Sequence, residues 1–301
     1  MQAQRFLTLL FILGLTACVT VAQQSRKLKV YISVDMEGVA GAVTDDQLGP
    51  GGFEYQRFRE FMTREAVAAV NAAKEAGATG VVVGDSHGNG ENLLIEQFPK
   101  DVLIIRSWPR RLSMMAGIDE TFDAVIFIAY HSSTNNKKGV RAHTFSSARL
   151  SRVALNGVEM TEGAWNAAIA GHFGVPVVMI SGDDAAVAEV RSLVGNIEAA
   201  ETKKSLGFHS ASTLTPQASA ELIGEKVKAA LKRLKDFKPY KIQSPLTLDV
   251  SFKNYRPSEV LAYLKGVERP DSHSIRYKAD SMLEIADFML VVTSYNIGLE
   301  P

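Results

Sequence analysis

The chain has 301 residues, of which 46% are hydrophobic and 22% charged, which is enough for one large domain with an appendage or for two domains. Its formal net charge at pH 7 is zero, with 33 Lys and Arg against 33 Asp and Glu. This composition is that of an ordinary globular protein. Because no basic run is present, it argues against a nucleic acid or another polyanion as partner.

The N-terminus has the pattern of a secretory signal. Arg5 precedes a short apolar stretch, residues 6–22, and the polar Gln23 follows. A charged start, an apolar centre and small residues at its end are typical of an export signal. The stretch is too short, and too soon broken by small residues, for a membrane span. We therefore predict a signal peptide over residues 1–23 and a location in the periplasm or cell envelope.

Two processing routes are open for this signal. The segment Leu15 to Cys18 resembles a bacterial lipobox, in which case the signal ends at residue 17 and Cys18 is acylated and attached to the membrane. The segment Thr20 to Ala22 suits ordinary signal peptidase and a soluble product. Cys18 is the only cysteine of the chain, which favours the lipoprotein. In either case the mature domain has no disulfide and no thiol for catalysis.

Short apolar runs alternate with helical patterns in the following part of the chain. The runs cover residues 28–34, 80–84, 124–129 and 175–180. Helices are predicted over 54–76, where apolar residues recur at helical spacing before Gly77, and over 163–172. Continuous apolar strands separated by helices predict an α/β fold with a mostly parallel sheet flanked by helices.

The last quarter of the chain has a different pattern. Thr215 and Pro216 begin a predicted helix that runs to about Lys235, because Pro is tolerated in the first turn. Leu, Leu, Val and Phe then alternate with polar residues over 246–252, as in a half-buried strand. We predict a linker over residues 238–245 between these elements. The predicted main α/β domain covers residues 28–240, and a small C-terminal α+β subdomain covers residues 244–301.

Each of the four apolar strands leads to titratable residues. In a parallel sheet the carboxyl ends of the strands share one edge, and ligands bind in the crevice there. One such ending means little, but four at one edge make a site. The residues are Asp35, His87, His131 and the pair Asp183-Asp184. For that pair we favour capping of the next helix over the alternative, which is holding the α-amino group of a substrate.

Further acidic residues accompany these strand ends. Asp35 and Glu37 are two residues apart and point to the same face of an extended backbone. Burying two like charges requires a cation. His87 has glycines on both sides, which let the backbone turn sharply. Glu162 begins a predicted helix, where the positive helix end favours its ionised form.

These residues together suit a metal. Two histidines and three carboxylates are typical of a borderline metal, with zinc as the leading choice. Five ligands exceed what one tetrahedral zinc usually takes from a protein, so we predict two zinc ions that share a bridging carboxylate. The candidate ligands are Asp35, Glu37, His87, His131 and Glu162. His143 lies twelve residues beyond His131, on a different segment.

In their order and spacing these segments resemble the D-aminopeptidase family, the zinc peptidases of dipeptide operons. The resemblance covers about residues 29–300, and its strongest parts are Val34 to Gly38, Asp85 to His87, Tyr130-His131, His143, Glu162 to Gly171 and Gly182 to Asp184. It implies that the five candidate ligands hold two zinc ions with Asp35 as the bridge, and that His143 is the catalytic residue outside the metal shell. It also implies a ring-like homo-oligomer.

The resemblance implies a zinc-dependent D-aminopeptidase that hydrolyses short peptides with an N-terminal D-amino acid through a metal-activated water. Whether His143 acts as acid and base or as nucleophile stays open. The export signal and the segments 49–52 and 135–138 depart from what is known of the family. Because loops near the crevice set substrate choice, they leave the exact substrate open.

Two other functions compete with this prediction. An exported metallohydrolase acting on another amide or a phosphoester would use the same ligands, but Arg and Lys do not cluster around the motifs as phosphate binding requires. Arg110-Arg111 is the exception, and we expect it on a surface loop. A non-catalytic solute-binding lipoprotein has no need of histidines and carboxylates at successive strand ends.

Overall fold

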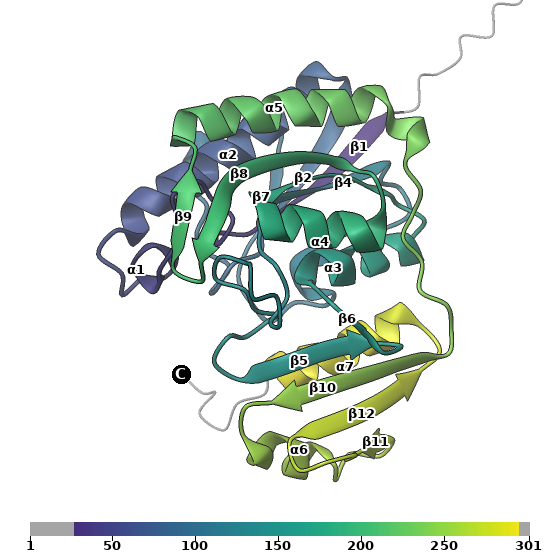
Figure 1. Cartoon of the computed structure of the whole chain (residues 1–301). Helices are drawn as coiled ribbons and strands as arrows, with labels where there is room; N and C mark the ends of the chain where they lie inside the picture. The colour runs from purple at the N-terminus through teal and green to yellow at the C-terminus, as the bar shows by residue number, and fades with distance from the viewer. Residues whose placement is uncertain (1–26, 295–301) are drawn as a thin grey trace, which may run out of the picture.

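A seven-stranded sheet forms the centre of the larger part of the molecule (Figure 1). The computed structural model describes residues 27–294, so the predicted signal and Cys18 lie outside the described residues. Neighbouring strands are parallel except β9, which is antiparallel to β8. The strands, in the order of the sheet, are β3 (Leu103–Ile105), β2 (Ala78–Asp85), β1 (Leu28–Val34), β4 (Ala124–Tyr130), β7 (Val177–Asp183), β8 (Glu198–Gly207) and β9 (Ser210–Thr213). The predicted α/β class with a mostly parallel sheet is confirmed.

Helices cover both faces of this sheet. On one face lie α2 (Tyr55–Glu75) and α5 (Pro216–Lys232), and on the other α3 (Glu162–His172) and α4 (Asp184–Val194) (Figure 1). A hydrophobic core lies on each face of the sheet, and the central strand β1 contributes side chains to both. Val30 and Ile32 pack in the core that contains α2 and α5, and Tyr31 packs in the core that contains α3 and α4. Buried on both sides, the strand is a continuous apolar run, as parallel strands require. A short helix, α1 (Asp45–Leu48), follows β1.

The predicted limits of two helices, 54–76 and 163–172, agree with the structure to one residue, whereas the helix predicted to run to about Lys235 ends earlier. Thr215 caps α5 by accepting a hydrogen bond from the backbone N–H of Ala218, and Pro216 is the first helical residue. This helix ends at Lys232, and a 3₁₀ turn, Leu234–Asp236, continues to the linker. Two further 3₁₀ turns cover Ile95–Gln97 and Ser113–Met115.

A second, antiparallel sheet lies below the first (Figure 1). Its strand β10 alternates between buried and half-buried residues, as the sequence predicts. Two of its strands, β5 and β6, come from the chain between β4 and α3, so the sheet joins that segment to the C-terminal part of the chain. The domain limits 28–240 and 244–301 stay a prediction. The elements are β11 (Val267–Glu268), β12 (Ser274–Ala279), β10 (Leu246–Phe252), β5 (Leu150–Leu155) and β6 (Val158–Glu159), with α6 (Tyr255–Leu261) and α7 (Met282–Ser294).

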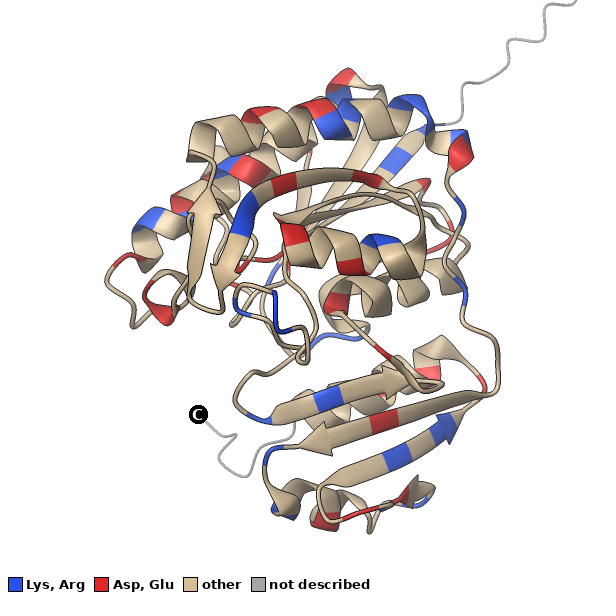
Figure 2. Ribbon diagram, in the orientation of Figure 1, with Lys and Arg blue, Asp and Glu red and all other residues tan. Residues whose placement is uncertain are grey.

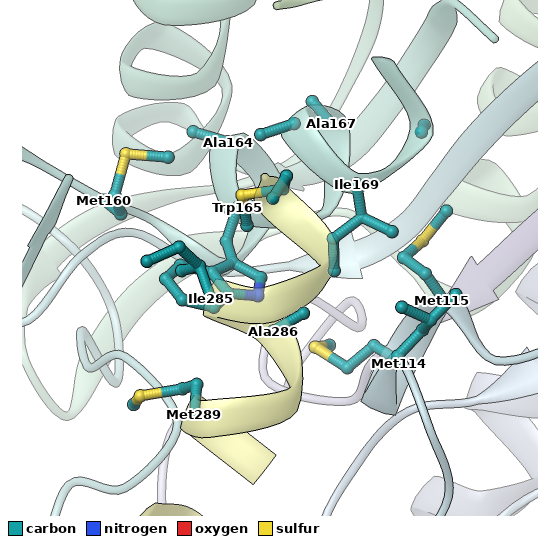
Figure 3. Close-up of a cluster of buried hydrophobic side chains, with 14 of the residues drawn as sticks. Met114, Met115, Met160, Ala164, Trp165, Ala167, Ile169, Ile285, Ala286 and Met289 are labelled. Atoms are coloured by element: carbon teal, nitrogen blue, oxygen red, sulfur yellow. The ribbon is translucent and has the colours of Figure 1, made fainter. Parts of the chain in front are cut away.

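The helix α7 connects the two layers. Figure 3 shows Trp165 of α3 beside Ile285 and Ala286 of α7, with Met114 and Met289 in the same buried cluster. The indole of Trp165 is 1% exposed, so its area is almost wholly removed from water, and burial of an aromatic ring of this size is a large stabilising contribution. The cluster therefore holds the second sheet and α7 against the main sheet.

Charges are spread over the surface. Figure 2 shows Lys and Arg interspersed with Asp and Glu on the upper helices α2 and α5. Within residues 27–294 no helix has the length and apolar character needed to cross a bilayer.

Candidate metal centre

Three adjacent strands deliver ligand candidates to one edge of the main sheet. β1 lies between β2 and β4 and is parallel to both, so their carboxyl ends coincide. Asp35 follows β1 and its N–H donates to Ile128 O of β4 at 2.9 Å. His87 and His131 follow β2 and β4. The predicted convergence of these strand ends is therefore observed.

The remaining two carboxylates reach the same point from a turn and a helix. Glu37 lies in the turn after β1, and Glu162 is the first residue of α3, whose cap Thr161 accepts from Ala164 N. All five predicted ligands are at most 7% exposed. They form two groups whose ligand atoms lie within 4.8 Å of one another, Asp35 with Glu37 and His87, and Asp35 with His131 and Glu162. Asp35 is the member common to both.

The contacts inside these groups are short. His87 Nδ1 lies 2.9 Å from Glu37 Oε2 and 3.3 Å from Asp35 Oδ1. On the other side His131 Nε2 lies 3.3 Å from Asp35 Oδ2 and 3.5 Å from Glu162 Oε2. The two oxygens of Asp35 thus face different histidines, the arrangement that a bridging carboxylate needs.

The second nitrogen of each histidine is held by a main-chain carbonyl. His87 Nε2 donates to Leu48 O at 2.6 Å, and His131 Nδ1 donates to Ser132 O at 3.0 Å. Since a carbonyl oxygen only accepts, that nitrogen carries the hydrogen, and in the neutral ring the other nitrogen presents a lone pair to the carboxylates. Metal-binding histidines are oriented in this way.

Two atoms of this centre have no hydrogen-bond partner. His131 Nε2 and Asp35 Oδ2 are both buried and unsatisfied, although unpaired buried polar atoms are costly. Two acceptors that face each other at 3.3 Å repel unless a cation or a proton lies between them. The residues therefore fit a metal ion, and oxygen and imidazole donors are ligands that zinc accepts.

Burial and charge shift the ionisation of these groups strongly. Burial, together with the negative charge of Glu37, raises the pKa of Asp35. Burial opposes ionisation of Glu37 as well, but the attraction of His87 outweighs it and holds the pKa of Glu37 well below its ordinary value. In the same way burial disfavours the charged form of His87, yet Glu37 and Asp35 raise its pKa. The centre thus concentrates negative charge that a cation would stabilise.

His143 joins the centre from the loop after β4. Its ring stacks on His131 with centroids 3.9 Å apart and an interplanar angle of 11°. Its Nδ1 donates to Arg141 O at 2.8 Å, and its Nε2 lies 3.9 Å from both Glu37 Oε1 and Glu162 Oε1. The structure therefore brings the predicted catalytic residue to the predicted ligands, with one nitrogen facing them.

The turn that carries Glu37 is held by residues that the sequence analysis missed. The ammonium of the buried Lys203 donates to the carbonyl oxygens of Glu37, Val39 and Ala42. Burial lowers the pKa of Lys203 to about 8. The pair Lys203-Lys204 gives no sign of burial in the sequence, because adjacent lysines are typical of an exposed segment.

Two more side chains hold the same turn. Thr202 donates to Gly38 O at 2.6 Å, and Glu65 of α2 accepts from Ala40 N at 3.0 Å. Gly38 itself lies against β4, where an added Cβ would be 2.3 Å from the main-chain carbon of Ala129. Only glycine fits here, so the residue after Glu37 is fixed by space.

The remaining predicted residues have structural contacts. Asp183 caps α4 by accepting from Ala186 N at 2.7 Å, which confirms the capping interpretation, and it also accepts from Val140 N at 2.6 Å. Arg111 is exposed and pairs with Asp287, as expected of a surface loop, whereas Arg110 is half-buried and donates to Asp85 O at 2.6 Å. Neither arginine lines the cleft described next.

A cleft of about 850 Å³ opens from the centre. Its inner end consists of carboxylates and imidazoles, and its outer walls carry aromatic and aliphatic side chains, a common composition of ligand pockets. Gly88, in the loop after His87, has a φ of +52°, so the expected sharp turn beside this histidine is present. The lining includes Asp35, Glu37, His87, His143 and Glu162 at the inner end, and Trp108, Phe145, Arg149, Leu290 and Val291 farther out.

Comparison with known proteins identifies the family. The sequence signature described as Peptidase M55, D-aminopeptidase, matches residues 28–291. The chain belongs to the D-aminopeptidase family. It is 32% identical over 267 residues to a D-aminopeptidase of Bacillus subtilis (strain 168), an alignment that covers 88% of this chain and 97% of that protein. The resemblance stated from the sequence is confirmed, and membership places the chain among the peptide hydrolases.

A solved structure is similar over the same extent. It is described as the Zn-dependent D-aminopeptidase DppA from Bacillus subtilis, a self-compartmentalizing protease. The TM-score is 0.85 at 32% identity, with 88% of this chain and 97% of that chain covered. The fold of the described residues is thus that of a zinc-dependent family member.

Proposed function

We propose that this protein is a zinc-dependent D-aminopeptidase that hydrolyses short peptides with an N-terminal D-amino acid. The observation that carries the proposal is the orientation of the two strand-end histidines. Each donates one N–H to a main-chain carbonyl and presents the other nitrogen to carboxylates that surround an unsatisfied, buried centre. The family and the relatives named above supply the class of reaction.

The centre would hold two zinc ions, with Asp35 as the shared ligand. Glu37 and His87 would complete one site, and His131 and Glu162 the other. When bound, zinc lowers the pKa of a water and polarises the scissile carbonyl. Lys203 and Thr202 hold the turn that carries Glu37, and Thr161 caps the helix that begins with Glu162. These contacts position two of the carboxylates in the metal-free protein, which reduces the entropy cost of metal binding.

His143 would move the proton of the reaction. Its Nε2 lies between Glu37 and Glu162 and lines the cleft. Burial and the neighbouring His131 lower the pKa of His143, so the neutral ring can take a proton at Nε2 and pass it to the leaving amine. The hydrogen bond from Nδ1 to Arg141 O keeps the ring in this orientation.

The test combines metal analysis with a paired substrate panel. The purified protein should contain about two zinc ions per chain, by the ligand count above, and should release D-Ala from D-Ala dipeptides but not L-Ala from the matched L-dipeptides. Metal removal by a chelator should abolish the activity and added zinc should restore it. Hydrolysis of a phosphoester, or of neither peptide series, would contradict the proposal.

Two further parts of the proposal concern the whole protein. Since the solved relative is described as self-compartmentalizing, we infer that this chain also forms a homo-oligomer, which sedimentation of the full mature chain would test. Residues 1–23 would direct export, with Cys18 as the acylated residue. Mass analysis of the mature N-terminus decides between the routes, because a chain that begins near Gln23 and carries no lipid contradicts acylation.

A further inference from the structure

The cleft is chemically asymmetric. Its inner end holds the carboxylates and imidazoles of the metal centre, and Arg149 is the single Lys or Arg among the described residues that line it. A lone cation in a cleft whose other charged groups belong to an acidic, metal-binding centre indicates that two charged parts of one ligand are recognised. The D-aminopeptidase proposal accounts for the inner end and leaves Arg149 without a role.

The backbone of Arg149 is held in place. Its N–H donates to Ser146 Oγ at 3.2 Å, and its carbonyl accepts from Lys253 N at 2.8 Å. These bonds fix the residue between the wall of the cleft and the end of β10. A side chain that starts from an anchored backbone loses less entropy when it binds a ligand.

The guanidinium of Arg149 keeps unused donors. Its Nη2 donates to Thr293 O at 2.9 Å, and its Nε is 3.4 Å from Ser146 Oγ. No carboxylate within residues 27–294 forms an ion pair with it, whereas Arg111 and Arg276 pair with Asp287 and Asp249. A guanidinium has five N–H groups, and a planar carboxylate is its best-matched partner.

The distance along the wall limits the ligand. His143 and Arg149 are six residues apart, and the segment between them turns twice, with hydrogen bonds from Ser146 N to Thr144 O and from Leu150 N to Ser146 O. Six extended residues would span about 20 Å, so the folded segment spans much less. A dipeptide or tripeptide, at about 7 or 10 Å, lies within this upper limit.

We propose that Arg149 binds the C-terminal carboxylate of a di- or tripeptide whose N-terminal residue lies at the metal centre. The proposal rests on the D-aminopeptidase function proposed above and specifies its substrate class, peptides short enough for both ends to be bound at once. Phe145 and Val291, which line the cleft with Arg149, would contact the side chain next to that carboxylate.

The test compares a dipeptide with its C-terminal amide. For the zinc-loaded wild type we expect kcat/KM to be about two- to fivefold higher for D-Ala-D-Ala than for D-Ala-D-Ala-amide, since one exposed charged contact is lost. Arg149→Met should remove this preference, and Arg149→Lys should retain part of it. Arg152→Met is the matched control, because Arg152 is on the adjoining strand and does not line the cleft.

The outcomes separate the two proposals. If Arg149→Met lowers the rates for acid and amide by the same factor, Arg149 is only structural and the inference is wrong. Equal use of acid and amide by the wild type would also overturn it, while the D-aminopeptidase function would stand. Failure of the zinc-loaded wild type to cleave any D-dipeptide, acid or amide, would instead refute the proposed function itself.

Discussion

Asp35 is the residue on which both groups of candidate ligands depend. Its two oxygens face His87 and His131 on opposite sides, so its removal should affect both ions. We expect Asp35→Ala to lose most bound zinc, measured by elemental analysis, while Asp46→Ala, an exposed acidic residue, keeps it. Retention of one zinc ion per chain at full affinity would show that Asp35 is not a bridge.

His143 and His131 stack on each other but are expected to do different work. His131 Nε2 has two carboxylate oxygens within 3.5 Å, whereas His143 Nε2 has none closer than 3.9 Å. His143→Ala should therefore keep its zinc and lose about 10²–10⁴-fold in kcat, the usual effect of removing a general acid or base. His131→Ala should lose zinc, with activity partly restored by excess metal.

The contrary results for this pair are equally definite. Because the ligand atoms of His143, Glu37 and His131 lie within 4.8 Å of one another, a zinc loss in His143→Ala that matches the loss in His131→Ala would make His143 a ligand. If the His143→Ala protein instead keeps both zinc and full activity, the proton does not pass through His143.

At the scale of elements, the turn after β1 depends on Lys203 of β8. The ammonium donates to three carbonyl oxygens of that turn. Val39 O also accepts from Ala42 N, so loss of the ammonium removes this partner from the carbonyls of Glu37 and Ala42, at about 1–3 kcal/mol each. We expect Lys203→Met to lower the free energy of unfolding by about 2–4 kcal/mol and to weaken zinc binding, because the turn positions Glu37.

The neighbouring lysine provides a control for this prediction. Lys204 is exposed on the same strand, so Lys204→Met removes the same charge and should change stability by less than about 0.5 kcal/mol. Urea unfolding and a zinc titration of both variants would check it. Equal effects of the two substitutions would show that the contacts of Lys203 with the turn contribute neither to stability nor to zinc binding.

The site elements were predictable from sequence to different degrees. β1, β2 and β4 are continuous apolar runs that lead to Asp35, His87 and His131, and a parallel sheet brings such ends together. Lys203 was not predictable, since a lysine is rarely buried and becomes so only through partners distant in sequence. The pairing of β5 with β10 was likewise hidden, because it joins segments 93 to 102 residues apart in the sequence.

At the scale of the whole molecule, the cleft exists because two sheets are held together. Its inner residues lie in the loops that follow strands of the main sheet and at the start of α3, and its outer wall includes Leu290 and Val291 of α7. The helix α7 is fixed by the cluster around Trp165, and the same indole contacts Phe145, with ring centroids 5.3 Å apart. One buried side chain thus supports both the junction of the layers and a wall of the cleft.

Trp165 is therefore the residue whose loss should affect stability and cleft together. Trp165→Ala should lower the free energy of unfolding by about 3–5 kcal/mol, since it opens a cavity between α3 and α7. Trp165→Phe retains most of the contact and should cost less. Denaturant unfolding followed by circular dichroism measures the loss. If the layers depend on this cluster, KM should rise more in Trp165→Ala than in Trp165→Phe, because Leu290 and Val291 of α7 line the cleft.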